Sequence, residues 1–215
     1  GACLAKMIQI RFFEKRMVEL FLEVMEKGGT PGALHSSEGQ EAVAVGVCSQ
    51  LQPGDYIFST YRGHGHALAR GLDLNAVVAE LFGKASGVSR GYGGSMHLFA
   101  PERRFMGGNG IVSGGLPMAL GTAFASVYRG EDAATIAFFG DGGSSQGSFH
   151  EGLNMAAIMK WPIFFVCENN HYAATTPVAL NCPIPHLADR ASAYGIPGIR
   201  VDGNDVFRIA QATQN

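Results

Sequence analysis

A carboxylate and an amide follow two apolar runs at a spacing that suits a metal-bound phosphate. The run 133–139 leads into Gly140-Asp141-Gly142, and the run 163–167 leads into Asn169-Asn170. Apolar residues recur at near-helical spacing between the two runs, which predicts one βαβ unit. Because parallel strands end at the same edge of a sheet, we expect Asp141 and Asn170 to lie close together.

These residue types suit Mg²⁺ and a diphosphate. Carboxylate and amide oxygens are hard ligands, and Mg²⁺ keeps few protein ligands and shares the rest with phosphate oxygens. Gly142 and Gly143 would let backbone N–H groups approach a phosphate at a helix N-terminus. Asp141 alone could instead be a helix cap, and Asn170 alone a turn residue. Their pairing at two strand ends favours the metal site.

The Gly-Asp-Gly and the Asn-Asn, with 26 residues between them, resemble the signature of thiamine-diphosphate enzymes. Further motifs resemble the α subunit of the E1 component of 2-oxo acid dehydrogenases and of the related acetoin dehydrogenases, in the same order over nearly the whole chain. These motifs are His35 with Gly39-Gln40-Glu41-Ala42, Tyr61-Arg62-Gly63-His64-Gly65, Gly93-Gly94-Ser95-Met96-His97, Gly108-Asn109-Gly110-Ile111-Val112, Phe139-Gly140-Asp141-Gly142, Asn154-Met155-Ala156-Ala157 and Cys167-Glu168-Asn169-Asn170.

The resemblance implies an α/β fold, a doubly wound and mostly parallel sheet flanked by helices that binds thiamine diphosphate. It implies that Asp141, Asn170 and the backbone carbonyl of Tyr172 hold Mg²⁺, with Gly142 and Gly143 at the cofactor's diphosphate. These assignments extend the metal site inferred from the strand ends.

The resemblance also assigns cofactor contacts outside this unit. Tyr61 and Arg62 would contact the diphosphate, and a guanidinium fork matches phosphate oxygens well. The alternative for Arg62 is a surface salt bridge. Gly110 and Val112 would line the cofactor's rings with their backbone.

His35 and His64 are the candidate catalytic residues. Gly63 and Gly65 flank His64, so its backbone can approach a ligand, and imidazole suits proton transfer near neutral pH. The resemblance implies that His35 faces the reacting carbon; the alternative is a polar residue of a surface loop. A zinc pair of His64 and His66 is disfavoured because no third histidine or cysteine has a fitting spacing.

The resemblance implies decarboxylation of a 2-oxo acid, or reaction of acetoin, with acyl transfer to a lipoyl group on a separate E2 acyltransferase. It also implies an α₂β₂ heterotetramer in which an E1 β subunit supplies the activating glutamate. We therefore expect no catalysis by this chain alone. The choice among pyruvate, branched-chain 2-oxo acids and acetoin stays open.

Composition fits one large domain over residues 1–215, with 47% hydrophobic residues for a core. The net charge is −2 and there are no long runs of like charge, so we expect no nucleic-acid partner. Only 16% of residues are charged, which suggests surface covered by other subunits. Scattered cysteines and the lack of a membrane-length apolar stretch predict a soluble, intracellular protein of the bacterial cytoplasm or mitochondrial matrix.

The family's α subunit continues beyond Asn215, so the chain is expected to be truncated at its C-terminus. This leaves a rival open: a truncated binding or structural module that keeps the fold and performs no chemistry. A different metal-dependent phosphate enzyme would explain Asp141 but not the Asn169-Asn170 spacing.

Periodicity predicts the elements that must position these residues. Helices are expected over 4–27, 38–51, 74–82, 116–128, near 187–194 and after Asp205, and strands over 56–58, 133–139, 163–167 and 199–201. The segment 83–115 holds ten glycines and is expected to be a long loop, ordered or disordered. The core stripe of the first helix is predicted at Ile8, Phe12, Phe13, Met17, Leu20, Phe21 and Val24.

Overall fold

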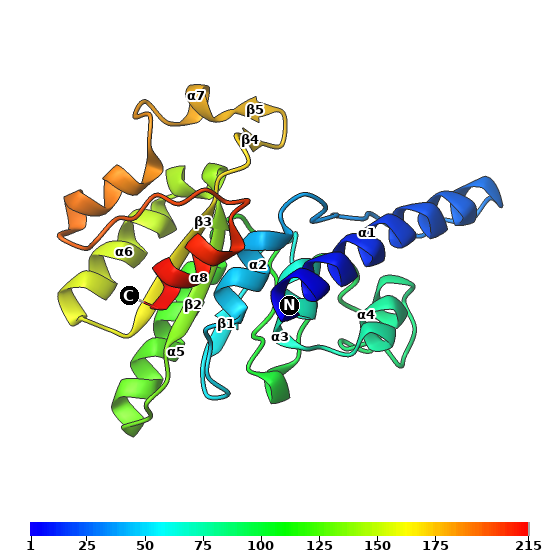
Figure 1. Cartoon of the computed structure of the whole chain (residues 1–215), viewed down its shortest axis with the longest axis horizontal. Coiled ribbons are helices and arrows are strands. Elements are labelled where there is room, and N and C mark those ends of the chain that lie inside the picture. The colour runs from blue at the N-terminus through cyan, green and yellow to red at the C-terminus, as the bar shows by residue number, and fades with distance from the viewer. Residues whose placement is uncertain (215) are drawn as a thin grey trace. The chain divides into compact units, whose positions relative to one another are not determined.

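A computed structural model describes residues 1–214, and its contacts divide the chain into two compact units (Figure 1). Unit 1 comprises Gly1–Leu51, Tyr61–Gly108 and the described part of Val201–Asn215. Unit 2 comprises Gln52–Thr60 and Asn109–Arg200. The single domain expected over 1–215 stays a prediction, because the two units alternate along the chain and this division does not test it.

Unit 2 is built on a parallel sheet of three strands in the order β1-β2-β3. The strands are β1 (Tyr56–Phe58), β2 (Thr135–Gly140) and β3 (Ile163–Glu168). The central strand β2 is buried from Thr135 to Phe139, as expected of a continuous apolar run in a parallel sheet. The expected α/β fold with a parallel sheet flanked by helices is thereby confirmed.

Two helices of unit 2 pack beside this sheet. Helix α5 (Gly115–Arg129) contacts β1 and β2, and α6 (Gly147–Met159) contacts α5. The rings of Phe139 in β2 and Phe149 in α6 lie 5.3 Å apart. The other elements of unit 2 are η2 (Asp141–Ser145), the antiparallel pair β4 (Tyr172–Ala173) and β5 (Thr176–Pro177), α7 (Val178–Asn181) and η3 (Leu187–Tyr194).

Unit 1 is helical. Helix α2 packs against α1, α3 and α8, and a Cβ at Gly46 would lie 2.6 Å from Cγ2 of Ile209. Only glycine therefore lets α8 approach α2 this closely. The elements are α1 (Ala2–Glu26), α2 (Glu41–Cys48), α3 (His64–Arg70), α4 (Leu74–Leu81), η1 (Pro101–Arg103) and α8 (Val206–Gln214).

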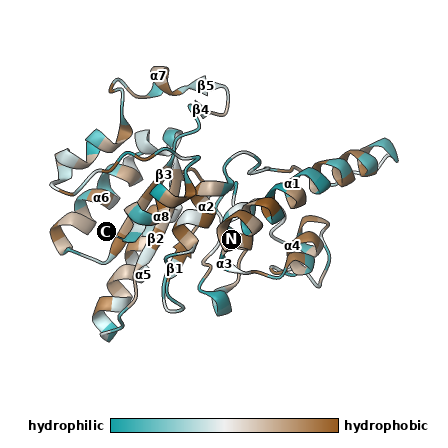
Figure 2. Ribbon diagram, viewed as in Figure 1, coloured by the Kyte–Doolittle hydropathy of each residue, from teal (hydrophilic) through white to brown (hydrophobic). Residues whose placement is uncertain are grey.

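The buried face of α1 differs from the predicted stripe. Ile8 and Phe12 are 46% and 69% exposed, whereas Ile10 and Glu14 are fully buried. Phe13, Met17 and Phe21 of the predicted stripe are buried. The buried positions follow one 3.6-residue face, and the sequence carries a second apolar face that the structure leaves exposed. Figure 2 accordingly shows hydrophobic and hydrophilic segments alternating along α1.

Several local elements differ from the prediction. Helix α3 was not predicted, because its Gly-His-Gly-His start has weak helix propensity; burial of His64, Ala67 and Leu68 stabilises it instead. The β4–β5 pair was also missed. The strand expected over 199–201 is non-repetitive chain, and no strand within residues 1–214 pairs with it.

The glycine-rich segment is ordered at its start by one carboxylate. Glu80 of α4 is fully buried and accepts backbone N–H groups from Ser89 (2.7 Å), Gly91 (2.8 Å), Gly93 (2.7 Å) and Gly94 (3.1 Å). Burial opposes ionisation, but these four donors outweigh it and lower the pKa of Glu80. A loop without regular structure thus acquires one conformation.

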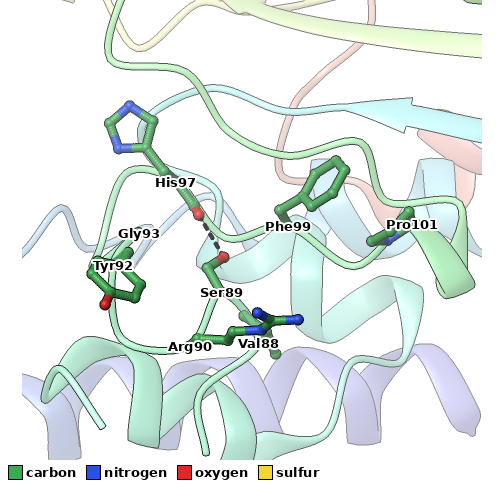
Figure 3. Close-up of a pocket in the computed structure, with 8 residues that line it drawn as sticks. All are labelled: Val88, Ser89, Arg90, Tyr92, Gly93, His97, Phe99 and Pro101. Carbon is green, nitrogen blue, oxygen red and sulfur yellow. Dashed lines mark hydrogen bonds between the residues drawn. The ribbon is translucent and has the colours of Figure 1, made fainter. Parts of the chain in front are cut away.

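An open pocket lies on this ordered loop, and Figure 3 shows the hydroxyl of Ser89 directed at the backbone oxygen of His97. That hydrogen bond is 2.9 Å long and ties the two sides of the loop together. The lining residues are Val88, Ser89, Arg90, Tyr92, Gly93, His97, Phe99 and Pro101. No helix within residues 1–214 has the length and apolar character needed to cross a membrane.

Candidate functional site

The C-terminal ends of β2 and β3 bring Asp141 and the Asn-Asn pair to one edge of the sheet. Gly140, the last residue of β2, pairs with Glu168, the last residue of β3. Asp141 follows directly, and Asn170 comes two residues after Glu168. The predicted proximity of these two segments follows from this register.

Asp141 has the properties of a carboxylate that binds a cation. It is 1% exposed, and its Oδ2 has no hydrogen-bond partner. Burial raises its pKa, while backbone N–H groups at Asp141 and Asn170 and the nearby His171 oppose the rise. A buried ionised carboxylate with an open oxygen is costly unless a positive charge compensates it. The residue therefore fits the Mg²⁺ that the family resemblance implies.

Asn169 and Asn170 both form local turns. Asn169 Oδ1 accepts the His171 N–H at 3.0 Å, and Asn170 Oδ1 accepts the Tyr172 N–H at 3.1 Å. An amide oxygen has a second lone pair, so this turn leaves Asn170 able to bind a cation. Within residues 1–214 no group of three His, Cys, Asp or Glu side chains could hold a metal. A cation at Asp141 would thus depend on amide, carbonyl and phosphate oxygens.

Close packing requires glycine at positions 142 and 143. A Cβ at Gly142 would lie 2.5 Å from Cβ of Ala173, and one at Gly143 would lie 2.5 Å from Oγ of Ser113. Ser113 Oγ–H also donates to the Gly143 carbonyl at 2.8 Å. The bare backbone beside Asp141 is therefore held between two other segments of unit 2, and its contact with a phosphate stays a prediction.

Gly110 and Val112 lie in the turn that precedes α5, also in unit 2. The turn is closed by the Gly114 N–H, which donates to the Ile111 carbonyl at 2.9 Å, and by Asn109 Oδ1, which accepts the Ile111 N–H. Val112 is 43% exposed and Ile111 is 73% exposed. Exposed apolar groups in an ordered turn suit contact with an apolar ring.

His64 lies in unit 1, within a closed hydrogen-bond network. Its side chain is fully buried, and Nδ1 lies 3.1 Å from Oε1 and 3.2 Å from Oε2 of Glu14. Nε2 lies 2.9 Å from Ser95 Oγ. Both ring nitrogens are therefore engaged by the protein. His64 is placed to orient its neighbours, and its direct proton transfer stays a prediction.

Glu14 is the functional candidate that sequence reasoning missed. Besides His64, its Oε1 accepts the Ser37 N–H at 3.0 Å and the Ser37 hydroxyl at 2.7 Å. Burial alone would raise its pKa, but His64 and Ser37 outweigh burial and lower it. The available signal was a glutamate between the apolar residues Ile10, Phe13 and Met17 on one helix face.

His35, Tyr61 and Arg62 form a second cluster of unit 1. The rings of His35 and Tyr61 are edge-on at 5.4 Å, and Cζ of Arg62 lies 5.6 Å from the Tyr61 ring centre. Arg62 also donates to the Ser36 carbonyl. Nδ1 of His35 is buried without a partner, and burial, then the charges of Arg62 and His64, lower the pKa of His35. His35 is thus neutral near pH 7, with an open ring nitrogen.

The structure thus divides the predicted site residues into two groups. Asp141, Gly142, Gly143, Asn170 and Tyr172 lie together with Gly110 and Val112 in unit 2. His35, Tyr61, Arg62 and His64 lie together in unit 1.

Sequence comparison shows the family to which the chain belongs. A family model described as the dehydrogenase E1 component matches residues 6–215 of the chain. The chain belongs to the dehydrogenase E1 component family. The α subunit of the acetoin:2,6-dichlorophenolindophenol oxidoreductase of Bacillus subtilis is 47% identical over 97% of this chain and 62% of its own length. The pyruvate dehydrogenase E1 component subunit alpha of Zymomonas mobilis is 46% identical over 96% of this chain and 58% of its own.

This E1 family member spans about three fifths of the length of these curated relatives. A solved structure from Mycobacterium smegmatis, described as a candidate thiamin diphosphate-dependent enzyme, aligns with 72% of this chain and 25% of its own. The TM-score of this alignment is 0.47 and its sequence identity is 22%.

Proposed function

We propose that this chain is the α subunit of the E1 component of a 2-oxo acid or acetoin dehydrogenase, and that it binds thiamine diphosphate through Mg²⁺. The buried carboxylate of Asp141, with its open Oδ2 at the strand ends, carries the proposal. The names of the two relatives, an acetoin oxidoreductase α subunit and a pyruvate dehydrogenase E1 α subunit, support it.

Asp141, the Asn170 amide and the Tyr172 carbonyl would hold Mg²⁺ and, through it, the diphosphate. When bound, thiamine diphosphate would supply the electron sink for breaking the carbon–carbon bond of the substrate, while the protein orients and excludes water. Tyr61 and Arg62 are proposed as further diphosphate contacts.

His35 is the residue we propose to hold or move a proton near the substrate. Its Nδ1 is open, and its lowered pKa keeps that nitrogen able to accept a proton at neutral pH. His64 is proposed to orient the substrate next to this cluster of side chains. Gly110 and Val112 are proposed to line the cofactor's rings.

The cofactor assignment is tested by calorimetric titration of the full-length protein with thiamine diphosphate plus Mg²⁺, beside ATP plus Mg²⁺. We expect binding of the first pair only, and loss of that binding in Asp141→Asn. Asp55→Asn is the matched control, because Asp55 is also buried in unit 2 but accepts the N–H groups of Gln52 and Ala134. Equal affinity in the wild type and Asp141→Asn would refute the metal assignment.

We further propose an E1 β subunit as partner in an α₂β₂ heterotetramer and a lipoyl-bearing E2 acyltransferase as acceptor. Assays of the assembled protein with pyruvate, branched-chain 2-oxo acids and acetoin would identify the substrate. Cofactor binding without turnover of any of them in the assembly would instead favour a non-catalytic binding module.

A further inference from the structure

A buried series of hydrogen-bonded side chains connects helix α1 to the backbone of His35. Its first link is Glu14 Oε1 to His64 Nδ1 at 3.1 Å, and its second is His64 Nε2 to Ser95 Oγ at 2.9 Å. The third link is the His35 N–H, which donates to Ser95 Oγ at 2.9 Å. Glu14, His64 and Ser95 are 0%, 0% and 7% exposed, so solvent cannot substitute for a lost link.

The chemistry of each group decides which atom donates and which accepts along this series of hydrogen bonds. An ionised carboxylate only accepts, so the proton of His64 must lie on Nδ1, facing Glu14. An Nε2 without a proton accepts from the Ser95 hydroxyl, whereas an Nε2 that carries a proton donates to Ser95 Oγ. In both states Ser95 Oγ keeps a lone pair for the His35 N–H. Every donor and acceptor along this series is matched as long as the Nδ1 proton of His64 faces Glu14.

We propose that Glu14 is a positioning residue for His35, acting through the Nδ1 proton of His64 and the hydroxyl of Ser95. The inference rests on the proposed role of His35 and adds to it the groups that hold its backbone in place. Glu14 contacts neither the His35 ring nor any group assigned to the cofactor. Its effect on His35 must therefore pass through the two intermediate side chains.

The same carboxylate fixes the residues that follow His35. Glu14 accepts both the N–H and the hydroxyl of Ser37, and Ser37 Oγ in turn accepts the Gly65 N–H at 3.2 Å. The segment from 35 to 37 is thus held at both ends by groups that converge on Glu14 and His64. A single side chain of α1 sets the position of a loop more than twenty residues away in sequence.

The test makes two measurements on the full-length protein. Nuclear magnetic resonance of ring-labelled histidine reports which nitrogen of His64 carries a proton, and amide hydrogen exchange reports how firmly the His35 N–H is hydrogen-bonded. In the wild type we expect the His64 proton on Nδ1. In Glu14→Gln a neutral oxygen accepts more weakly than a carboxylate, so a His64 ring without the Nδ1 proton should become populated. Ser95→Ala should leave the Nδ1 proton in place and speed exchange of the His35 amide by about threefold to tenfold, the range that corresponds to one net hydrogen bond.

Glu41→Gln is the matched control. Glu41 is also buried in unit 1 and binds Arg11 at 2.6 Å and the Gly39 N–H at 3.1 Å, but it contacts neither His64 nor Ser95. Any loss of general stability should appear in this variant, whereas the Nδ1 proton of His64 and the His35 exchange rate should not change.

Two results would overturn the proposal: a wild-type His64 whose Nδ1 carries no proton, or unchanged His35 exchange in Ser95→Ala. The second variant decides the matter even if Glu14→Gln fails to fold. Neither readout needs cofactor or substrate, so a failure of the proposed function would appear separately, in the thiamine diphosphate titration. If the proposed function holds, Ser95→Ala should lower kcat of the assembled protein more than it changes KM.

Discussion

The Cβ position of Gly142 lies 2.5 Å from the Cβ of Ala173, so β4 of the same chain closes over the second glycine of the Gly-Asp-Gly segment. This contact gives the glycine a role that is independent of any ligand. Gly142→Ala should therefore destabilise the cofactor-free protein by about 1–3 kcal/mol, the usual cost of overpacking. Urea unfolding without Mg²⁺ measures it.

Gly140→Ala is the comparison variant for Gly142→Ala. A Cβ at Gly140 would meet only the Glu168 carbonyl oxygen, at 4.0 Å. We expect a change in unfolding free energy well below that of Gly142→Ala. Equal stability of Gly142→Ala and wild type would show that β4 can move away, and that packing does not demand the glycine.

Asp141→Asn should stabilise the metal-free protein at neutral pH. Because burial raises the pKa of Asp141, the folded chain holds the proton more tightly than the unfolded chain does. Stability therefore falls as pH rises from the ordinary aspartate pKa of about 3.9 to the raised value. Calorimetric melting should show a gain of the order of 1 kcal/mol for Asp141→Asn at pH 7 and little difference at pH 3. Added Mg²⁺ should raise the melting temperature of the wild type alone.

Glu80→Gln should loosen the loop 83–94. The amide has only one oxygen to offer, so at least one of the four backbone donors loses its acceptor, and we expect a loss of about 2–3 kcal/mol. Cleavage by an added protease should then map to this loop. Glu102→Gln, at an exposed position of η1, serves as the control and should be cleaved like the wild type.

The same carboxylate predicts a pH dependence. Since the pKa of Glu80 is lowered on folding, its stabilisation is fully present above the ordinary glutamate pKa of about 4.3 and is lost as pH falls through the lowered value. Protection of the loop against an acid-active protease should decline below about pH 4 in the wild type. In Glu80→Gln it should be low at every pH.

The chain alone should show no 2-oxo acid decarboxylation with an artificial electron acceptor. Helices α5 and α6 expose apolar side chains at Val127 (53%), Tyr128 (81%) and Ile158 (70%), as expected of a face that another subunit covers. Addition of a β subunit should restore turnover and bury these residues. Appreciable turnover by the chain alone would contradict the need for a partner.

The sequence predicted those parts of the site that depend on local pattern and parallel-strand topology. The runs that became β2 and β3 are apolar and of strand length, so the approach of Asp141 and Asn170 followed from chain order. The partners of Glu14 could not be predicted, because they lie 23 and 50 residues away in sequence and are reached by tertiary packing. The partners of Glu80 lie in a nearby glycine-rich loop, whose conformation no periodic pattern indicates. A charge on an apolar helix face indicates only that some buried partner exists.

The packing of α8 on α2 through Gly46 and Ile209 has a consequence for the order of synthesis. During synthesis α2 leaves the ribosome long before α8. The face of α2 around Gly46 therefore stays exposed to solvent until all of unit 2 has been made. Contacts this distant in sequence form slowly because loop closure precedes them. Unit 1 can be completed only after α8 emerges, and a nascent chain arrested at residue 200 should expose this apolar face to chaperones.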